Sequence, residues 1–282
     1  MIAPMSSTMV GDMFALARRA KVMSYIVASA SLAYLVGSPI IGFIAGLVDW
    51  RAAFLGYLLP FAVLAFVLAT VGVKPGPVRG SSSGQKYVEG FKVIFRSRSA
   101  LSCLLGPSLS MTAWQVVLLY AASFFRQRYA VSLSFISIAN IAFAGTFTAG
   151  SLAAGRIIDR IGRKKVTVLS ASLAGVFIMI FMLIPDFLTA NALCVIACLF
   201  AGIRMTASTS LALEQVLTYR GTMMSLYTAT DQIGLAIGSG LGGALLLMYN
   251  YEALGLVLGA LGIAGAGIMQ ALAVDPTRKE RS

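Results

Sequence analysis

The chain of 282 residues is 59% apolar and 11% charged, and its mean hydropathy is +0.88. Because about a quarter of the residues in soluble domains are charged, this composition excludes a water-soluble protein and predicts an all-α, polytopic membrane protein. The net charge of +12 does not indicate a nucleic-acid partner, since the lysines and arginines gather in alternate loops, as cytoplasmic loops require.

Eight apolar stretches reach the length of about twenty residues that a helix needs to cross a bilayer. They lie near residues 24–48, 52–73, 99–125, 132–154, 166–184, 190–213, 222–249 and 253–274. Residues 1–16 are apolar but too few to span. The basic residues fall mainly on one side of this arrangement, which predicts a multi-pass protein of the plasma (inner) membrane with a cytoplasmic linker and C-terminus.

The longest polar stretch, residues 74–98, is the best internal boundary. Its run 80–84 is Gly-Ser-Ser-Ser-Gly, which is typical of a flexible linker. After it, Tyr87, Phe91, Ile94 and Phe95 share one helical face, which predicts an amphipathic helix on the cytoplasmic membrane surface. The boundary divides the chain into residues 1–73, a second part 99–274 and a short tail 275–282.

Residue types that carry catalysis or bind metals are scarce. The sequence has no histidine, and its three cysteines (Cys103, Cys194 and Cys198) all lie in apolar runs. We interpret the cysteines as packing residues. We therefore expect no metal site, no enzymatic activity and no cofactor. The N-terminus also lacks the basic region that precedes the apolar part of a cleavable signal peptide.

The two ends of the chain resemble each other. A shift of about 200 residues places Arg19 on Arg220, Gly37 on Gly238, and the turn at Trp50 on Tyr251. This shift is the length of six spans with their loops, so the chain contains parts of two six-helix halves.

The charged turn at residues 155–165 carries the most specific motif. The residues of this motif are Gly155, Asp159, Arg160, Gly162, Arg163 and Lys164. Its two glycines are expected to let the backbone turn sharply. This turn resembles the signature of the major facilitator superfamily, roughly G-x-x-x-D-R-x-G-R-K/R. The resemblance implies a transporter of two six-helix halves that rock to give alternating access, whereas a generic basic loop is the plainer alternative.

In that family the long basic loop follows the sixth span, but here it follows the second full one. The resemblance therefore implies that residues 1–73 hold the inner half of helix four and helices five and six. Residues 99–274 would then be the complete C-terminal half. We expect about the first three and a half helices of the fold to be missing, as in a fragment or a misplaced start.

The stretch Gly37-Ser38-Pro39-Ile40-Ile41-Gly42 and the turn Trp50-Arg51 partly resemble the helix-five motif of the family's drug:proton antiporters. The match is partial because Ser38 stands where the motif has glycine. This resemblance favours proton-coupled efflux of small lipophilic compounds by a monomer. A proton-coupled importer of small metabolites, a transport-incompetent membrane fragment and a plain packing helix stay open.

The resemblance also implies inter-half contacts that close the cytoplasmic side without binding substrate. Asp159 would accept hydrogen bonds at the start of the fifth-helix equivalent, near residues 21–24. Glu214, which together with Arg220 flanks an inner helix end, would pair with Arg160 or Arg163.

Arg204 and Asp231 are charges inside predicted spans. Each lies about nine residues from an inner helix end, so both sit roughly 13 Å deep. A lone charge at the bilayer centre costs about 3 kcal/mol. We therefore predict a salt bridge, which is either static or released when Asp231 takes up a proton; an anionic substrate at Arg204 is a further alternative.

The resemblance further implies a central cavity, and polar and amphipathic residues of the spans are candidates to line it for a lipophilic, cationic substrate, with plain packing as the alternative. They are Trp114, Gln115, Tyr120, Asn140 and Gln232. The glycines at 234, 238 and 242 form a stripe that predicts close contact with another helix.

Overall fold

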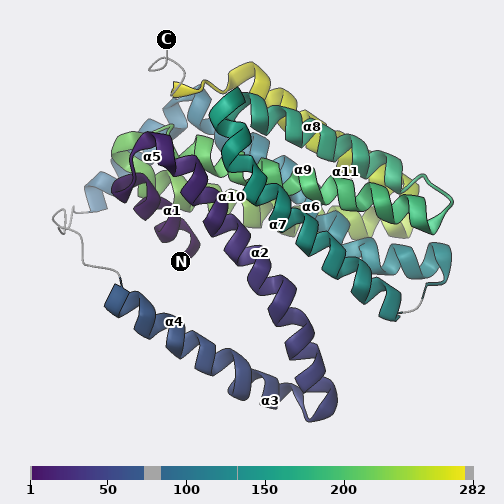
Figure 1. Cartoon of the computed structure of the whole chain (residues 1–282). Coiled ribbons are helices and arrows are strands. Elements are labelled where there is room, and N and C mark those ends of the chain that lie inside the picture. The colour runs from purple at the N-terminus through teal and green to yellow at the C-terminus, as the bar shows by residue number, and fades with distance from the viewer. Residues whose placement is uncertain (1, 73–83, 132, 277–282) are drawn as a thin grey trace.

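A computed structural model describes residues 2–72, 84–131 and 133–276 of the chain. These residues form helices joined by short turns, with no strand among them (Figure 1). The elements are α1 (Ile2–Met13), α2 (Leu16–Leu47), α3 (Trp50–Ala53), the π-helical turn η1 (Phe54–Leu58), α4 (Leu59–Gly72), α5 (Gly84–Arg96), α6 (Arg98–Tyr129), α7 (Leu133–Ile161), α8 (Arg163–Phe181), α9 (Phe187–Leu213), the 3₁₀ turn η2 (Leu217–Tyr219), α10 (Arg220–Met248) and α11 (Tyr251–Leu272).

Eight helices of the described part are long and apolar enough to cross a membrane, which confirms the predicted number of spans and the all-α class. Most of them extend beyond the predicted apolar stretches, since a helix continues into its polar ends wherever the backbone hydrogen bonds can be made. The first, for example, begins at Leu16 rather than at residue 24.

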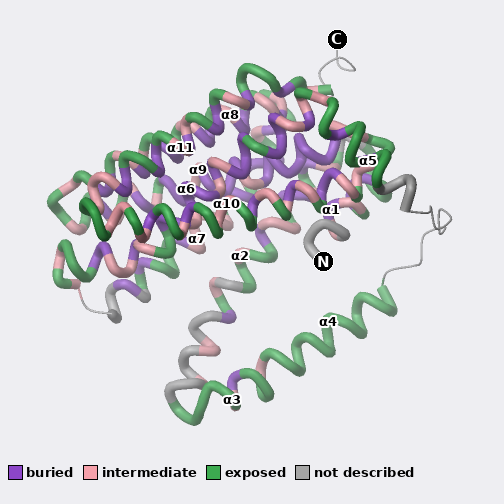
Figure 2. Tube along the Cα trace, turned by 180° about the vertical axis from the view of Figure 1, so that it is seen from behind, coloured by how far each residue is buried: buried purple, intermediate pink, exposed green. Residues whose placement is uncertain are grey.

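Helices α6 to α11 pack into one bundle, which we name the C-terminal bundle. Figure 2 shows the buried residues concentrated there. Its core contains the cysteines 194 and 198 among apolar side chains, as their predicted packing role requires. Helices α7 and α9 touch backbone to backbone, because a Cβ on Gly202 would collide with the Phe147 carbonyl and one on Gly150 with the Leu199 carbonyl. Only glycine allows this approach.

The α2–α4 hairpin extends away from the C-terminal bundle (Figure 1). The first half of α2 packs on α7, where Ala20 of α2 joins a buried cluster with Ala154 and Ile158. Helix α4 is exposed along its whole length (Figure 2). Its surface is almost entirely apolar, a composition suited to lipid or to other apolar helices.

The turn between α7 and α8 corrects one prediction. Helix α7 continues through Gly155 to Ile161, and α8 begins at Arg163, so the chain turns at Gly162 alone, where φ is +94°. Gly155 does not turn the backbone. It permits close packing instead, since a Cβ there would lie 3.1 Å from the Lys21 Cα and 3.2 Å from the Ser24 Oγ.

The predicted amphipathic helix exists as α5, whereas residues 80–83 of the linker lie outside the described part. Its Ile94 is fully buried, while Phe91 and Phe95 are exposed. The helix rests on α6 and on the start of α10, where a Cβ on Gly90 would lie 3.2 Å from the Thr222 hydroxyl. Part of the apolar face therefore covers protein.

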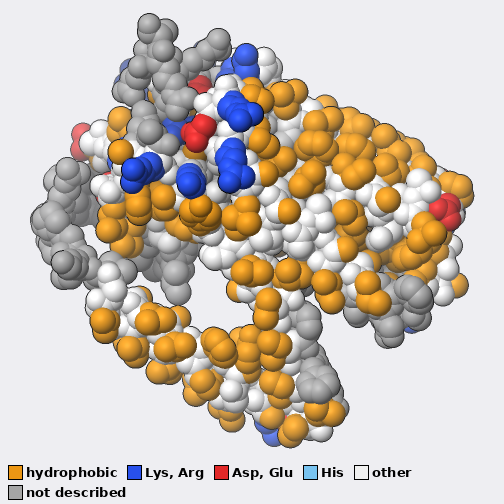
Figure 3. Space-filling model, viewed as in Figure 1, with side chains coloured by type: hydrophobic (Ala, Val, Ile, Leu, Met, Phe, Trp, Pro, Cys, Tyr) orange, Lys and Arg blue, Asp and Glu red, His pale blue; other side chains and the backbone are white. Residues whose placement is uncertain are grey.

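The two ends of the bundle differ in character. Figure 3 shows lysines and arginines gathered at one end, which we name the basic end. The end of α7, which leads into the turn at Gly162, packs on the start of α2 there, and the Trp50 turn follows the far end of the 32-residue α2. At 1.5 Å per residue the two turns are separated by roughly 48 Å of helix. They thus lie toward opposite ends, as opposite membrane sides require.

Candidate functional site

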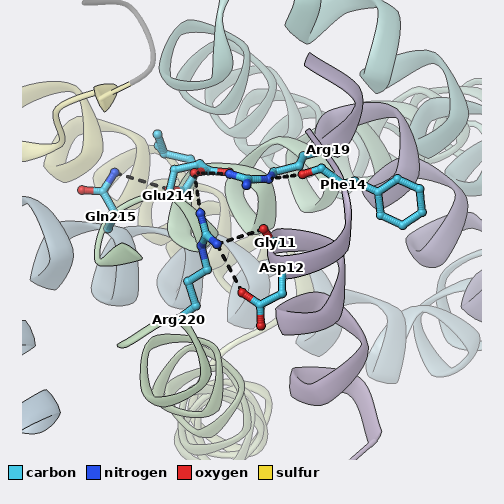
Figure 4. A network of polar contacts seen from close by, with 8 residues as sticks. Gly11, Asp12, Phe14, Arg19, Glu214, Gln215 and Arg220 are labelled. Carbon is cyan, nitrogen blue, oxygen red and sulfur yellow. Dashed lines mark hydrogen bonds and ion pairs between the residues drawn. The ribbon is translucent and has the colours of Figure 1, made fainter. Parts of the chain in front are cut away.

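Glu214 is the centre of a charge network at the basic end (Figure 4). It follows the last residue of α9, and its side chain is only 3% exposed. Both carboxylate oxygens accept hydrogen bonds from Nη1 of Arg19, at 2.8 and 2.9 Å. The Nη2 atom of Arg220 lies 3.6 Å from Oε2. One buried carboxylate is therefore bound by two arginines from different parts of the chain.

Each arginine is also held by backbone oxygens of the N-terminal region. Arg19, in the first turn of α2, donates from Nε to the Phe14 carbonyl at 2.9 Å. Arg220, the first residue of α10, donates from Nη1 to the Gly11 carbonyl at 2.9 Å and approaches Asp12 Oδ1 at 3.3 Å. A Cβ on Gly11 would lie 2.9 Å from the Arg220 Cδ, so a larger residue there would displace this side chain.

We name these contacts of Gly11, Asp12, Arg19, Glu214 and Arg220 the gate network. Its geometry follows the internal repeat, because Arg19 and Arg220 are the two arginines that the repeat superimposes. Arg19 reaches the acid that follows α9, and Arg220 reaches the acid near the end of α1. Each repeat thus contributes an arginine that binds an acid of the other repeat.

The gate network has a small net free energy of formation, which suits a contact that can open. Desolvation of a buried ion pair offsets most of its Coulomb attraction, so the intact network adds little net stability. Removal of one partner, in contrast, leaves a buried charge uncompensated and costs about 3–5 kcal/mol. Loss of one partner should therefore cost more stability than the intact network contributes.

This network corrects the predicted pairing of Glu214 with Arg160 or Arg163. Arg160 lies on the exposed side of the last turn of α7, and Arg163 is buried at the start of α8. Glu214 instead turns toward the α1–α2 junction. Sequence reasoning missed Arg19, Asp12 and Gly11 as partners, although the repeat had already paired Arg19 with Arg220.

The other signature residues lie close by. The contact of Gly155 with Lys21 and Ser24 brings the end of α7 against the start of α2, the region in which a partner for Asp159 was expected. Asp159 is exposed, and the identity of its partner stays a prediction. The backbone N–H groups of Arg163 and Lys164 point to Oδ2 of Asp275, at 3.1 and 3.4 Å.

The predicted salt bridge between Arg204 and Asp231 is not formed among the described residues. Arg204 is 1% exposed and donates to the Pro107 carbonyl (3.3 Å) and the Met111 sulfur (2.9 Å) of α6. Asp231 is 7% exposed, and its Oδ1 has no hydrogen-bond partner in the described part of the chain. The two charges still interact electrostatically with each other and with Tyr227. The prediction failed because helix depth was estimated but the direction of each side chain around its helix was not.

The cavity candidates divide into two groups. Trp114 is 3% exposed in the core of the C-terminal bundle, and the half-buried Tyr120 donates to the Ser239 carbonyl at 2.9 Å, so in this structure both pack against neighbouring helices. Gln115 is half-buried, and Asn140 and Gln232 are exposed. The predicted stripe of Gly234, Gly238 and Gly242 does contact another helix, since Cβ atoms there would meet side chains of α6.

The partial helix-five motif lies in an unbroken helix. Gly37 is buried, and a Cβ there would lie 3.8 Å from the Tyr57 hydroxyl, whereas for Pro39 and Gly42 the structure describes the helical backbone alone. Beyond the helix, the Arg51 guanidinium lies 5.3 Å from the centre of the Trp50 ring, a cation–π contact at the surface.

Comparisons with known proteins agree with this arrangement. The family described as Major Facilitator Superfamily matches residues 1–129 and 103–282. An uncharacterized MFS-type transporter of Bacillus subtilis, YwfA, is 28% identical over 93% of this chain and 64% of its own length. The chain therefore spans less than two thirds of that relative.

Two solved structures share the fold. The human organic anion transporter MFSD10 (TETRAN) superimposes with a TM-score of 0.79 at 14% identity, over 95% of this chain and 67% of that protein. A bacterial homologue of the iron transporter ferroportin, in an outward-facing state, gives a TM-score of 0.75 at 14% identity, over 93% and 66%. At this identity the likeness shows the arrangement of helices alone.

Proposed function

We propose that this chain, which belongs to the Major Facilitator Superfamily, is a proton-coupled transporter that exports small lipophilic compounds by alternating access. Its family and its curated relative are described as transporters, which supports a transport function over an enzymatic one. The apolar helices make it a multi-pass membrane protein. A plasma-membrane location with the basic end in the cytoplasm is part of the proposal and is supported by the concentration of lysine and arginine there.

The gate network is the observation that carries the proposal. Alternating access requires two parts of one protein that meet at one membrane side and separate again. The reciprocal contacts of Arg19 and Arg220 join α1 and α2 to α9 and α10 at the basic end. Two states that differ by a few kcal/mol can both be populated, and an ion-pair network of small net stability is suited to that.

The direction and the coupling ion have weaker support. Efflux is favoured by the partial helix-five motif, in which Gly37 packs against Tyr57. Proton coupling is favoured by Asp231, a buried carboxyl group in electrostatic contact with Arg204. A proton on Asp231 would remove the negative charge that interacts electrostatically with Arg204 and would thereby change the forces between α9 and α10.

Asp231→Asn tests the coupling. We expect the 282-residue chain in proteoliposomes to move ethidium, a lipophilic cation, in response to an imposed pH gradient. The asparagine variant should retain the shape of the site but lose at least about 90% of the gradient-driven rate, because it cannot take up a proton. Asp49→Asn, which alters an exposed acid at the far end of α2, is the control and should behave as the wild type.

The outcomes separate the alternatives. Normal dependence on the pH gradient in Asp231→Asn contradicts proton coupling through this residue. An exporter moves ethidium away from the cytoplasmic side of the protein, so movement toward that side favours an importer. Failure of the wild-type chain to transport any of a panel of lipophilic and small metabolite probes favours a transport-incompetent membrane fragment.

A further inference from the structure

The segment that follows α11 makes a second polar cluster at the basic end. The backbone N–H of Val274 donates to the Ser99 hydroxyl at 2.8 Å. That hydroxyl donates to Oε1 of Gln215 at 2.6 Å, and Nε2 of Gln215 donates back to the Val274 carbonyl at 3.0 Å. The three bonds form a closed ring that ties together the start of α6, the end of α9 and the end of α11. Hydrogen bonds arranged in this way polarise and strengthen one another.

Asp275 extends this cluster to α8. The residue that precedes α8, Gly162, has no side chain with which to cap the helix. The Asp275 carboxylate accepts from the N–H groups of Arg163 and Lys164 and so supplies the cap from more than 100 residues away. Such a carboxylate satisfies free N–H groups and interacts favourably with the positive end of the helix dipole.

The cluster adjoins the gate network through one peptide bond. Gln215 holds the end of α9 on the C-terminal segment, and the preceding residue, Glu214, holds Arg19 and Arg220. The position of the Glu214 carboxylate therefore depends on where Gln215 fixes the chain after α9.

We propose that Ser99, Gln215, Val274 and Asp275 form a clasp that positions Glu214 for the gate network. Asp275 and Gln215 are thus positioning residues, which do not touch the arginines of the network themselves. The part of this proposal that concerns opening and closing rests on the proposed transport function, whereas the clasp is defined by its own contacts.

Cys103 provides a native reporter for the clasp. It lies one helical turn after Ser99, is 1% exposed, and shares a buried cluster with Ala273 of the C-terminal segment. Cys194 and Cys198 are buried in a different part of the C-terminal bundle. Release of the clasp should expose Cys103 alone, while global unfolding would expose all three cysteines.

The experiment measures the rate at which N-ethylmaleimide modifies each cysteine of the full chain in membranes, by peptide mass spectrometry. We expect Asp275→Ala and Gln215→Ala to raise the rate at Cys103 about five- to tenfold, the range that loss of one helix cap or buried hydrogen bond produces. Asp275→Asn keeps a carbonyl acceptor and should give an intermediate rate.

Asp186→Ala is the matched control, because Asp186 caps α9 at the other end of the bundle. Its carboxylate accepts from the Thr189 N–H at 2.9 Å, and this hydrogen bond lowers the pKa of the group below its ordinary value. The control removes the same kind of cap but should leave Cys103 protected.

A second reporter tests the link to the gate. Leu213→Cys places a thiol at a fully buried position against Gly11 of α1. The proposal requires Asp275→Ala to raise labelling at residue 213 as well as at Cys103. Unchanged labelling of Cys103 in both alanine variants overturns the clasp, and labelling of all three native cysteines together in every variant does the same. If the labelling rate rises at Cys103 but not at residue 213, the clasp does not position Glu214, and that part of the proposal is overturned.

Glu214→Gln keeps the two hypotheses apart, because it breaks the gate network and leaves the clasp intact. It should raise labelling at residue 213 and leave Cys103 protected. If residue 213 stays protected, the hypothesis of a gate is contradicted, while labelling of Cys103 still tests the clasp.

Discussion

Gly202→Ala is expected to lower the free energy of unfolding by about 3 kcal/mol, the upper part of the usual range for overpacked cores. The added Cβ would collide with the Phe147 carbonyl, and backbone cannot move aside as a flexible side chain can. Helices α7 and α9 would have to separate along the contact that Gly150 and Gly202 make reciprocally. In detergent, the melting temperature should fall by roughly 6 to 12 °C.

Gly240→Ala is the control for this prediction. Gly240 lies inside α10 with nothing within 4 Å of the position that a Cβ would occupy. Alanine there should be neutral or should stabilise the protein by about 0.5–1 kcal/mol, because it restricts the unfolded chain. Equal effects of the two substitutions would contradict the close packing of α7 and α9.

Glu214→Gln is expected to open the basic end. The variant leaves Arg19 and Arg220, with side chains 14% and 13% exposed, facing each other without the carboxylate that balances them. Loss of one partner from a buried ion pair costs about 3–5 kcal/mol in the closed arrangement. If about half of this appears in the equilibrium between closed and open forms, labelling of Leu213→Cys by N-ethylmaleimide rises roughly 12- to 60-fold.

Glu252→Gln is the matched control. Glu252 pairs with Arg128 at 3.2 Å, but both side chains are more than 40% exposed. An exposed pair of this kind contributes about 1 kcal/mol or less, so the control should change labelling at residue 213 by less than about twofold. Similar effects of both variants would show that Glu214 acts through net charge and not through its contacts.

The apolar stretches were sufficient to predict the spans, because helix length and hydropathy are properties of local sequence. The position of the signature turn was predicted correctly, but the path of its backbone was not. The sequence shows two glycines, and only the helical hydrogen bonds of the structure reveal that Gly155 is a packing position and Gly162 the turn.

Contacts between distant helices were harder to predict. The partner of Glu214 depends on how the start of α2 meets the end of α9, which no local pattern encodes. For Arg204 and Asp231, depth along the helices was estimated, but their rotation decides which groups meet, and Arg204 bonds to α6 instead. The internal repeat held unused information, since the residue that it paired with Arg220 is the other arginine of the gate network.

A double-mutant cycle on Arg19 and Glu214 tests the central claim most directly, with labelling at Leu213→Cys as the readout. The account predicts that Arg19→Ala and Glu214→Ala each raise the labelling rate and that the double variant labels no faster than Glu214→Ala alone, because both remove the same contact between the two repeats. If the fold-increase of the double variant equals the product of the two single fold-increases, the residues act independently. That result would contradict a gate that depends on their pairing.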